Sequence, residues 1–505
     1  MTVTVMKRLL ALCLAVMLLV PAGALAALDG YNSVYTYSYD YWDDIKEMPD
    51  AYRVEQVLYS ATLGLDVAMR KPQSLYVRDR DLYVCDTGNN RVLHLTRGAD
   101  GTFTLVRIIT EIAGAEPAVL KTPSDVFVAE NGDIYICDKD NNRVVQADKE
   151  LNFIRSFVKP DDNTFDQNLS FLPDKLVVNT SGRVYVLATN VNKGLVKYEA
   201  DGTFTGFIGA NPVKYTMWDY IWKTFLSTKA QRAQQASFVP TEYSNIAIDS
   251  EGFIYATNTV FSEYDLVWDN AKPIRRLNAI GNDILVKNGW YPPIGDLHWE
   301  EGSIDYGPSK FCDITVLDND IYVAFDRTRG RLFGYDPQGI LLWCFGTKGN
   351  SEGAFLSAAS IEHMGNDLIC LDANNCSVTV FTPTEYGELI YQASDEYLSG
   401  HYDESADTWR EVLRFNANYN LAFIGIGRAL MRQENYKEAM DYFKMAYDRE
   451  NYGDAYRYYR KGLIEDNVGW LVAGVAALLV VPLIIRQVKK MKWEVEENER
   501  KKKHL

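Results

Sequence analysis

The stretch Leu82-Tyr-Val-Cys-Asp-Thr-Gly-Asn-Asn-Arg-Val92 occurs a second time, 52 residues later, as Ile134-Tyr-Ile-Cys-Asp-Lys-Asp-Asn-Asn-Arg-Val144. Weaker copies begin at Val184, Ile254, Ile321 and Leu368. Each copy follows a short strand pattern of alternating apolar and polar residues and a turn. Repeats of about 40 to 50 residues that each hold four strands are typical of a β-propeller. The sequence therefore predicts a mainly β fold, a six-bladed β-propeller over residues 52–383.

The two ends of this region predict how the ring of blades closes. The sixth unit lacks an outermost strand after Val378-Thr-Val-Phe381, while the alternating stretch Tyr52–Tyr59 precedes the first unit with nothing to pair with. Unpaired sheet edges are a liability that closed folds avoid. We therefore expect the N-terminal strand to complete the sixth blade.

The segments Asp86–Val92 and Asp138–Val144 resemble the NHL repeat, a propeller family of bacteria and animals. The resemblance covers residues 50–383 and is strongest in the first two units. It implies that the polar residues of these segments hold a strand-to-strand turn together through hydrogen bonds to the backbone, in preference to binding a ligand. The residues with this implied structural role are Asp86, Asn90, Arg91, Asp138, Asn142 and Arg143.

From residue 384 to 465, the apolar residues no longer recur at every second position, as in strands, but at the spacing of a helix. Gly400–Ala406 matches Glu434–Met440 at a distance of 34 residues, which is the period of the tetratricopeptide repeat (TPR). Residues that resemble the packing positions of that family are Gly427, Tyr436, Ala439, Phe443 and Ala446. Two and a half repeats are fewer than such arrays usually need to stand alone. We expect these TPR-like helices to pack on the propeller or to connect it to the segment that follows.

Both termini carry the pattern of a membrane-directed segment. Residues 1–26 join two basic residues to an apolar run and an Ala-x-Ala site, which predicts a cleaved signal peptide, followed by a linker at 27–51. Residues 468–485 hold no charge over 18 positions and predict one transmembrane helix in the lipid bilayer; a buried amphipathic helix is the alternative, but the segment has no polar face. The basic tail 486–505 is expected in the cytoplasm. The sequence therefore predicts a single-pass cell-membrane protein with its N-terminal ectodomain outside.

Charge and cysteine content exclude other classes. The chain of 505 residues has a net charge of −16, and the part between the two basic ends carries 42 basic and 64 acidic residues. An acidic body without a basic stripe repels a phosphate backbone, so we expect no nucleic-acid partner. Six cysteines follow the signal peptide without metal-site spacing. We expect free thiols, with a Cys312–Cys344 bridge left open.

Little in the sequence points to catalysis. The chain has five histidines and no nucleophile-elbow, phosphate-loop or dinucleotide motif. His298, within Asp296–Glu301, has neighbouring carboxylates suited to a divalent metal, but a solvated acidic loop is the favoured interpretation. An enzyme would need polar side chains that converge near the central channel, such as Asp, Glu, Asn or His from at least three blades around one channel mouth, and the sequence displays no such set. We expect no metal, no cofactor and no catalytic residue. Some six-bladed relatives are metal-dependent, which leaves a hydrolase or lyase of the lactonase-like type as the alternative by resemblance.

Three long insertions, at residues 211–240, 259–273 and 289–308, fall in connections that emerge on one face of the propeller. They contain five of the ten tryptophans. Aromatic rings with polar tips stack on sugars or hold peptides at low entropic cost. The helical spacing in the first insertion also fits a small core that covers a blade end. The ligand-binding residues predicted for this insertion face are Trp218, Trp222, Trp268, Trp290, Tyr291 and Trp299.

Together these features predict a membrane-anchored, extracytoplasmic binding or scaffold protein. The combination of a propeller with TPR-like helices resembles bacterial envelope proteins that use both parts as interaction modules. The resemblance implies an envelope protein or a glycan as the partner, beside a sugar transporter or a surface assembly.

Overall fold

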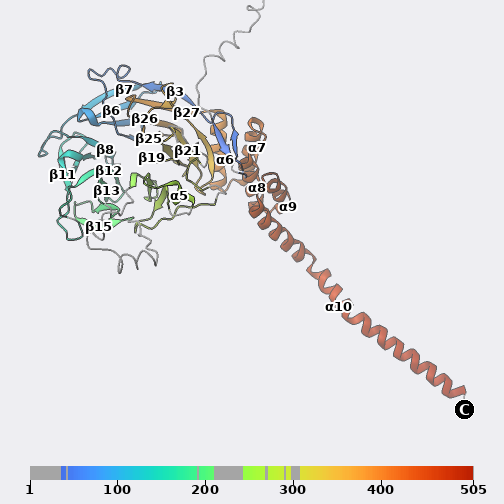
Figure 1. The fold of residues 1–505 in the computed structure, drawn as a ribbon. Coiled ribbons are helices and arrows are strands. Elements are labelled where there is room, and N and C mark those ends of the chain that lie inside the picture. The colour runs from blue at the N-terminus through green and yellow to red at the C-terminus, as the bar shows by residue number, and fades with distance from the viewer. Residues whose placement is uncertain are drawn as a thin grey trace, which may run out of the picture. The chain divides into compact units, whose positions relative to one another are not determined.

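The computed structural model describes residues 36–40, 42, 44–165, 167–189, 191, 193–209, 243–267, 271–288, 292–296 and 307–503. The predicted signal peptide lies outside these residues. The chain divides into two compact units, Met1–Tyr391 and Gln392–Leu505 (Figure 1). The first unit is a six-bladed β-propeller and the second is helical, which confirms the fold class predicted from the repeats.

Six sheets form the blades, and the strands of each blade run in order from the innermost to the outermost. Blade 1 holds β4 (Ser74–Arg78), β5 (Asp81–Asp86), β6 (Arg91–Arg97) and β7 (Phe103–Ile109). Blade 2 holds β8 (Pro123–Val128), β9 (Ile134–Asp138), β10 (Arg143–Ala147) and β11 (Phe153–Val158). Blade 3 holds β12 (Leu172–Val178), β13 (Val184–Thr189), β14 (Leu195–Tyr198) and β15 (Phe204–Ile208).

The second half of the ring continues this order. Blade 4 holds β16 (Tyr243–Ile248), β17 (Ile254–Asn258) and β18 (Ile274–Leu277). Blade 5 holds β19 (Phe311–Val316), β20 (Tyr322–Asp326), β21 (Arg331–Tyr335) and β22 (Leu341–Phe345). The short parallel pair β23 (Thr347–Lys348) and β24 (Ala354–Phe355) follows. Blade 6 holds β25 (Ala358–Met364), β26 (Asp367–Asp372), β27 (Ser377–Pro383) and β3 (Tyr52–Leu58).

The second strand of each blade is mostly apolar and almost wholly buried, because the blades pack against one another on both faces. All residues of β9 and β20 are buried, whereas the outer strand β7 is buried only at its two end residues and alternates exposed with half-buried positions between them. The repeated apolar copies in the sequence correspond to these sandwiched strands. Burial on two faces therefore explains why the copies read as continuous apolar runs.

Strand β3 completes blade 6, as the unpaired N-terminal stretch predicted. It pairs antiparallel with β27 in a register that runs from Val378 opposite Leu58 to Pro383 opposite Tyr52. Tyr52 is fully buried, and its hydroxyl donates to the carbonyl oxygen of Asn366 at 3.0 Å. Strands from the two ends of the propeller region therefore close the ring.

Two details of the strand count differ from the expectation. Blade 4 has three strands among the described residues, where four were expected, and the chain after β18 forms a bridge between Leu277 and Asp283. The stretch 27–51, expected to be a linker, contains β1 (Tyr37–Tyr39) and β2 (Ile45–Glu47), which extend blade 5 beyond β22. Both tyrosines of β1 are buried, and burial of their rings favours this extra hairpin.

The polar residues of the repeated segments tie the end of a second strand to the preceding connection. Asp86 accepts hydrogen bonds from the backbone nitrogen of Arg70 and from Nε of Arg91, both at 2.7 Å. Arg91 also donates to the carbonyl oxygen of Val67 at 2.6 Å, and Asn90 adopts a left-handed backbone with φ of 54°. The contacts of Asp138 with Arg143 and the conformation of Asn142 repeat this arrangement in blade 2.

The six cysteines that follow the signal peptide are free thiols. Cys312 and Cys344, for which a bridge was left open, are therefore not joined. Cys85 and Cys137 are fully buried, and burial raises their pKa well above its ordinary value. A raised thiol pKa disfavours the reactive thiolate, so these two cysteines are packing residues.

The helical region consists of α6 (Glu385–Leu398), α7 (Tyr402–Phe415), α8 (Asn420–Arg432), α9 (Tyr436–Met445) and α10 (Arg449–Lys503). Helices α7 and α9 begin 34 residues apart. A side chain at Gly427 would meet the ring of Phe443 at 2.6 Å, so this position of α8 requires glycine. Helix α10 is long and apolar enough to cross a membrane, with a mean hydropathy of 2.6 over its most apolar 18 residues. It contains the predicted span 468–485.

Candidate functional site

The aromatic residues predicted to bind ligand lie outside the described part of the chain. These residues are Trp218, Trp222, Trp268, Trp290, Tyr291 and Trp299, and His298 is also outside it. The insertion face therefore stays a prediction. Of the second insertion, the structure describes the short helix α5 (Glu263–Val267) and its flanking residues.

Asp296 begins the segment that was interpreted as a solvated acidic loop, and this interpretation is wrong for Asp296 itself. Its side chain is buried, and its carboxylate accepts hydrogen bonds from the hydroxyls of Tyr37 and Tyr39 and from Nη1 of Arg331. The backbone nitrogen of Asp296 donates to Oγ of Ser309 at 3.0 Å. This carboxylate anchors the N-terminal strand to blade 5, so it is not a free metal ligand.

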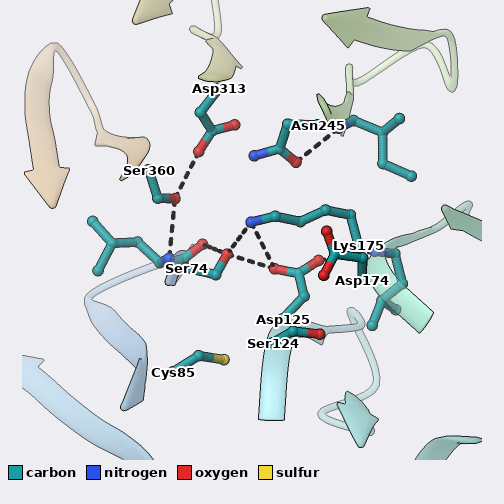
Figure 2. Close-up of polar contacts among 12 residues, drawn as sticks. Ser74, Cys85, Ser124, Asp125, Asp174, Lys175, Asn245, Asp313 and Ser360 are labelled. Carbon is teal, nitrogen blue, oxygen red and sulfur yellow. Dashed lines mark hydrogen bonds and ion pairs between the residues drawn. The ribbon is translucent and has the colours of Figure 1, made fainter. Parts of the chain in front are cut away.

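A second group of polar side chains occupies the centre of the propeller, one from each blade. We call it the polar ring; its members are Ser74, Asp125, Lys175, Asn245, Asp313 and Ser360 (Figure 2). All six are at least nine-tenths buried, with exposed fractions of 0–7%. They occupy equivalent positions, because each lies opposite the matching residue of the second strand in its own blade.

A β-bulge places most members of the polar ring. The pairing register shifts by one residue immediately before the ring residue in five blades. Examples are the shifts between Pro123 and Asp125 and between Pro173 and Lys175. A bulge bends the strand and redirects the side chain that follows it. Each innermost strand carries its ring residue within its first four positions, and this polar side chain faces its neighbours around the central axis.

One side of the polar ring is built around Lys175. Its ammonium donates to Oγ of Ser74 at 2.8 Å and lies 3.8 Å from Oδ1 of Asp125 (Figure 2). Ser74 in turn donates to Oδ1 of Asp125 at 2.6 Å, and the backbone nitrogen of Leu176 donates to Oδ2 at 2.8 Å. Burial alone would lower the pKa of Lys175, but the charges of Asp125 and Asp313 raise it above its ordinary value. Lys175 is therefore a buried counter-ion for the ring.

The other side of the polar ring is built around Asp313. Its Oδ2 accepts hydrogen bonds from Oγ of Ser360 at 2.6 Å and from the backbone nitrogen of Ile361 at 2.8 Å. Burial raises the pKa of Asp313 to about 6, partly offset by Lys175. Asn245 accepts from the backbone nitrogen of Ile246 at 2.7 Å, and its amide nitrogen points toward the middle of the ring (Figure 2). That nitrogen has no hydrogen-bond partner among the described residues.

Four members of the polar ring, Ser74, Asp125, Asn245 and Asp313, form one end of a cavity of about 740 Å³ that runs along the innermost strands. The other end is formed by the turns that join the first and second strands of the six blades. The turn residues that line it include Asp79, Asn131, Gly182, Gly252, Asp318 and Gly365. Between the two ends, the wall includes Tyr76, Phe127, Thr315 and Glu362. Burial raises the pKa of Glu362 well above its ordinary value, which favours its protonated form.

The donor set of the polar ring does not fit a divalent metal. Among the described residues, no three or more His, Cys, Asp or Glu side chains are grouped so that they could hold one. The oxygens of Asp125 and Asp313 accept hydrogen bonds from backbone nitrogens and serine hydroxyls, and the ammonium of Lys175 supplies the compensating charge. A metal would have to displace these donors.

The expectation that no polar set converges on the channel is wrong. Asp125, Asn245 and Asp313 come from three different blades and meet at the polar ring. A signal for the ring exists in the sequence, since every member lies eight or nine residues before the start of its repeated copy, as Asp125 does before Ile134. The six positions hold four residue types, so what recurs at this position is a polar residue and not one particular amino acid.

Comparisons with known proteins show no matching family model. No curated protein matches the chain. Among solved structures, the chain is similar to a streptogramin B lyase, at 12% identity over 66% of this chain and 100% of the other, with a TM-score of 0.39. Virginiamycin B lyase from Staphylococcus aureus matches at 12% identity over 66% of this chain and 99% of the other, with a TM-score of 0.37. A structure described as a putative gluconolactonase matches at 10% identity over 67% of this chain and 94% of the other, with a TM-score of 0.39. Similarities at this level carry no argument about activity.

Proposed function

We propose that this chain is a membrane-anchored, extracytoplasmic binding protein whose propeller recognises a carbohydrate or an envelope partner. The anchor is the apolar part of α10, residues 468–485, in the lipid bilayer. The orientation rests on the signal-peptide pattern at 1–26 and on the basic tail 486–505. The acidic propeller then lies outside the cell.

The observation that carries this proposal is the central cavity with its polar ring. Its volume of about 740 Å³ is that of a ligand pocket, and such pockets combine apolar walls with a few fixed polar groups. Six strands from six blades hold the ring in place, so the groups that face a ligand are fixed before it binds. A preformed set of hydrogen-bonding groups suits recognition.

A metal-dependent hydrolase or lyase is the competing function, and the residues of the ring do not favour it. Among the described residues, no cluster of three or more His, Cys, Asp or Glu side chains at the ring could hold a metal ion. A lysine that activates a serine nucleophile would have to be unprotonated. Lys175 donates to Ser74 and has a raised pKa, so it cannot take the proton of that hydroxyl at neutral pH.

The insertion face and the TPR-like helices complete the proposal as surfaces for an envelope partner. Trp290 and Trp299 are the proposed contacts on that face, because neither belongs to the helical stripe of the first insertion. An envelope protein held there would be retained near the membrane by α10.

Two experiments test the proposed function. Protease added to protoplasts that carry the full-length chain should digest the propeller and leave a tag after residue 505 intact; a protected propeller with a digested tag would contradict the orientation. Full-length protein in detergent micelles should bind glycans on an array, or capture an envelope protein after cross-linking in intact cells. Absence of both kinds of binding would refute a recognition role.

A further inference from the structure

We infer that the central cavity is a binding site for an uncharged, hydroxyl-rich ligand such as a neutral oligosaccharide, with one ligand oxygen held at the polar ring. The inference rests on the proposed function and names the site and the ligand class. It differs from the prediction drawn from the sequence, which placed recognition on the insertion face.

The free hydrogen-bonding capacity of the polar ring is that of a donor. The amide nitrogen of Asn245 carries two N–H groups without a described partner, and its residue is 4% exposed. The ammonium of Lys175 has three N–H groups, of which one donates to Ser74. The carboxylates of Asp125 and Asp313 already accept hydrogen bonds from within the protein. Asn245 lines the cavity, so its amide nitrogen is placed to donate to an acceptor oxygen of a ligand.

The charges around the cavity disfavour an anionic ligand. The titratable acidic and basic side chains that line it include seven Asp or Glu residues, of which burial favours the protonated form of Glu362, and one arginine, Arg78. Three of the carboxylates, on Asp79, Glu130 and Asp318, belong to exposed residues at the turn end. An anion would pass this acidic mouth against its potential, and a cation would meet the ammonium of Lys175 at the polar ring. An uncharged ligand avoids both penalties.

The wall of the cavity supplies the surfaces that a sugar requires. Tyr76 and Phe127 lie side by side, with ring centroids 4.8 Å apart, and both line the cavity. The hydroxyl of Tyr76 donates to the carbonyl oxygen of Val128 at 3.1 Å, which fixes the ring. Thr315 and Glu362 add polar atoms to the wall. Fixed aromatic rings pack against the C–H groups of a sugar. Nearby hydroxyl and carboxyl groups exchange hydrogen bonds with the hydroxyls of the sugar.

The turn end of the cavity lies on the face of the propeller opposite the insertion face. The turn end is formed by connections between first and second strands, such as those at Asn131 and Asp318. The insertions at 211–240 and 289–308 instead connect one blade to the next and begin at the opposite ends of those strands. The polar ring lies at the same ends of the innermost strands as these insertions, so separate substitutions of Asn245 and of Trp290 or Trp299 are needed to show which side chains contact the ligand.

The test compares variants of Asn245 in the full-length chain in detergent micelles. The probes are arrays of neutral oligosaccharides, uronic-acid oligosaccharides and amino-sugar oligosaccharides, with affinities then measured by titration calorimetry. Asn245→Ala removes the amide, and Asn245→Asp keeps the acceptor for Ile246 while removing the donor. Both should weaken binding of a neutral oligosaccharide about tenfold or more, since each removes a buried hydrogen bond to the ligand.

Asn278→Ala is the matched control. Asn278 lies on the same blade, accepts hydrogen bonds from the backbone nitrogens of Ile280 and Asn282, and does not line the cavity. Its loss should leave affinity unchanged. Thermal unfolding of all variants separates a binding defect from loss of the fold, and the aspartate variant preserves the local backbone contact if the alanine variant does not fold.

The outcomes are separable from failure of the proposed function. Neutral glycan binding that both Asn245 variants retain would overturn the cavity as the site, and its loss in Trp290→Ala and Trp299→Ala would place recognition on the insertion face with the proposed function intact. Binding confined to uronic-acid or amino-sugar glycans would overturn the ligand class. Capture of an envelope protein without any glycan binding would overturn this inference and leave the binding role standing.

Discussion

Replacing Lys175 by methionine should destabilise the propeller far more than an ordinary lysine substitution. The variant keeps the length and apolar stem of the side chain but removes the ammonium that lies 3.8 Å from Oδ1 of Asp125. At this distance, with an effective dielectric constant near 20, the lost attraction is about 4 kcal/mol. Removing one partner of a buried ion pair costs about 3–5 kcal/mol, because the remaining charge stays buried without compensation. We therefore expect the free energy of unfolding to fall by about 3–5 kcal/mol.

A lysine of the same blade provides the control. Nζ of Lys197 also lies 3.8 Å from a carboxylate oxygen, on Glu199, but these side chains are 21% and 33% exposed against 9% for both Lys175 and Asp125. Lys197→Met should cost less than about 1 kcal/mol, since solvent screens the pair. The comparison holds distance constant and changes burial.

Urea unfolding of the full-length chain in detergent micelles, followed by tryptophan fluorescence, measures both losses. The double variant Lys175→Met/Asp125→Asn should recover at least half of the loss of the single variant, because it removes both charges together. Equal, small losses for Lys175→Met and Lys197→Met would show that the ammonium does not compensate the polar ring. Failure of the double variant to recover stability would assign the loss to packing.

Three further predictions concern the same propeller. Because the pKa of Asp313 is raised to about 6 in the folded state, protonation of this group stabilises the fold fully below pH 3.8, and the effect is lost as pH rises through about 6. The free energy of unfolding of Asp313→Asn should therefore rise by up to about 3 kcal/mol relative to the wild type between pH 4 and 7. Parallel pH profiles of urea unfolding for the two proteins would contradict this. Deleting residues 52–59 should cost several kcal/mol by opening blade 6 and exposing two sheet edges, and an unchanged melting temperature would refute closure by β3. Asp296→Ala should release the N-terminal hairpin, so limited proteolysis should cut within residues 36–47 sooner than in the wild type, whereas an unchanged cleavage rate would show that other contacts hold it.

The repeats made the architecture predictable because blade packing leaves a strong mark on the sequence. Second strands such as Ile134–Asp138 are buried on both faces and therefore repeat as apolar runs. Ring closure was predictable because Tyr52–Tyr59 and the sixth unit each lacked a partner strand. The hairpin at β1 and β2 was missed because three-residue strands carry too short an alternation to be recognised, and the buried contacts of Tyr37 and Asp296 join segments far apart in the chain.

The polar ring was missed for a different reason. Its members are two serines, two aspartates, one lysine and one asparagine, so no single residue type recurs in all six blades. Lys175 follows Asp174 within Leu172–Val178, and two adjacent charged residues near the start of a strand look like a solvent-exposed turn. Its partners Ser74 and Asp125 belong to other blades, and the bulges that align them appear in the pairing register alone. The aromatic insertion residues, by contrast, were conspicuous in the sequence, and their role stays a prediction.

A structure of the full-length chain bound to a neutral oligosaccharide would test the central claim most directly. The account predicts ligand density inside the propeller, with a sugar oxygen within hydrogen-bonding distance of the amide nitrogen of Asn245 and a sugar ring against Tyr76 and Phe127. Ligand density against Trp290 or Trp299, with none in the cavity, would contradict it.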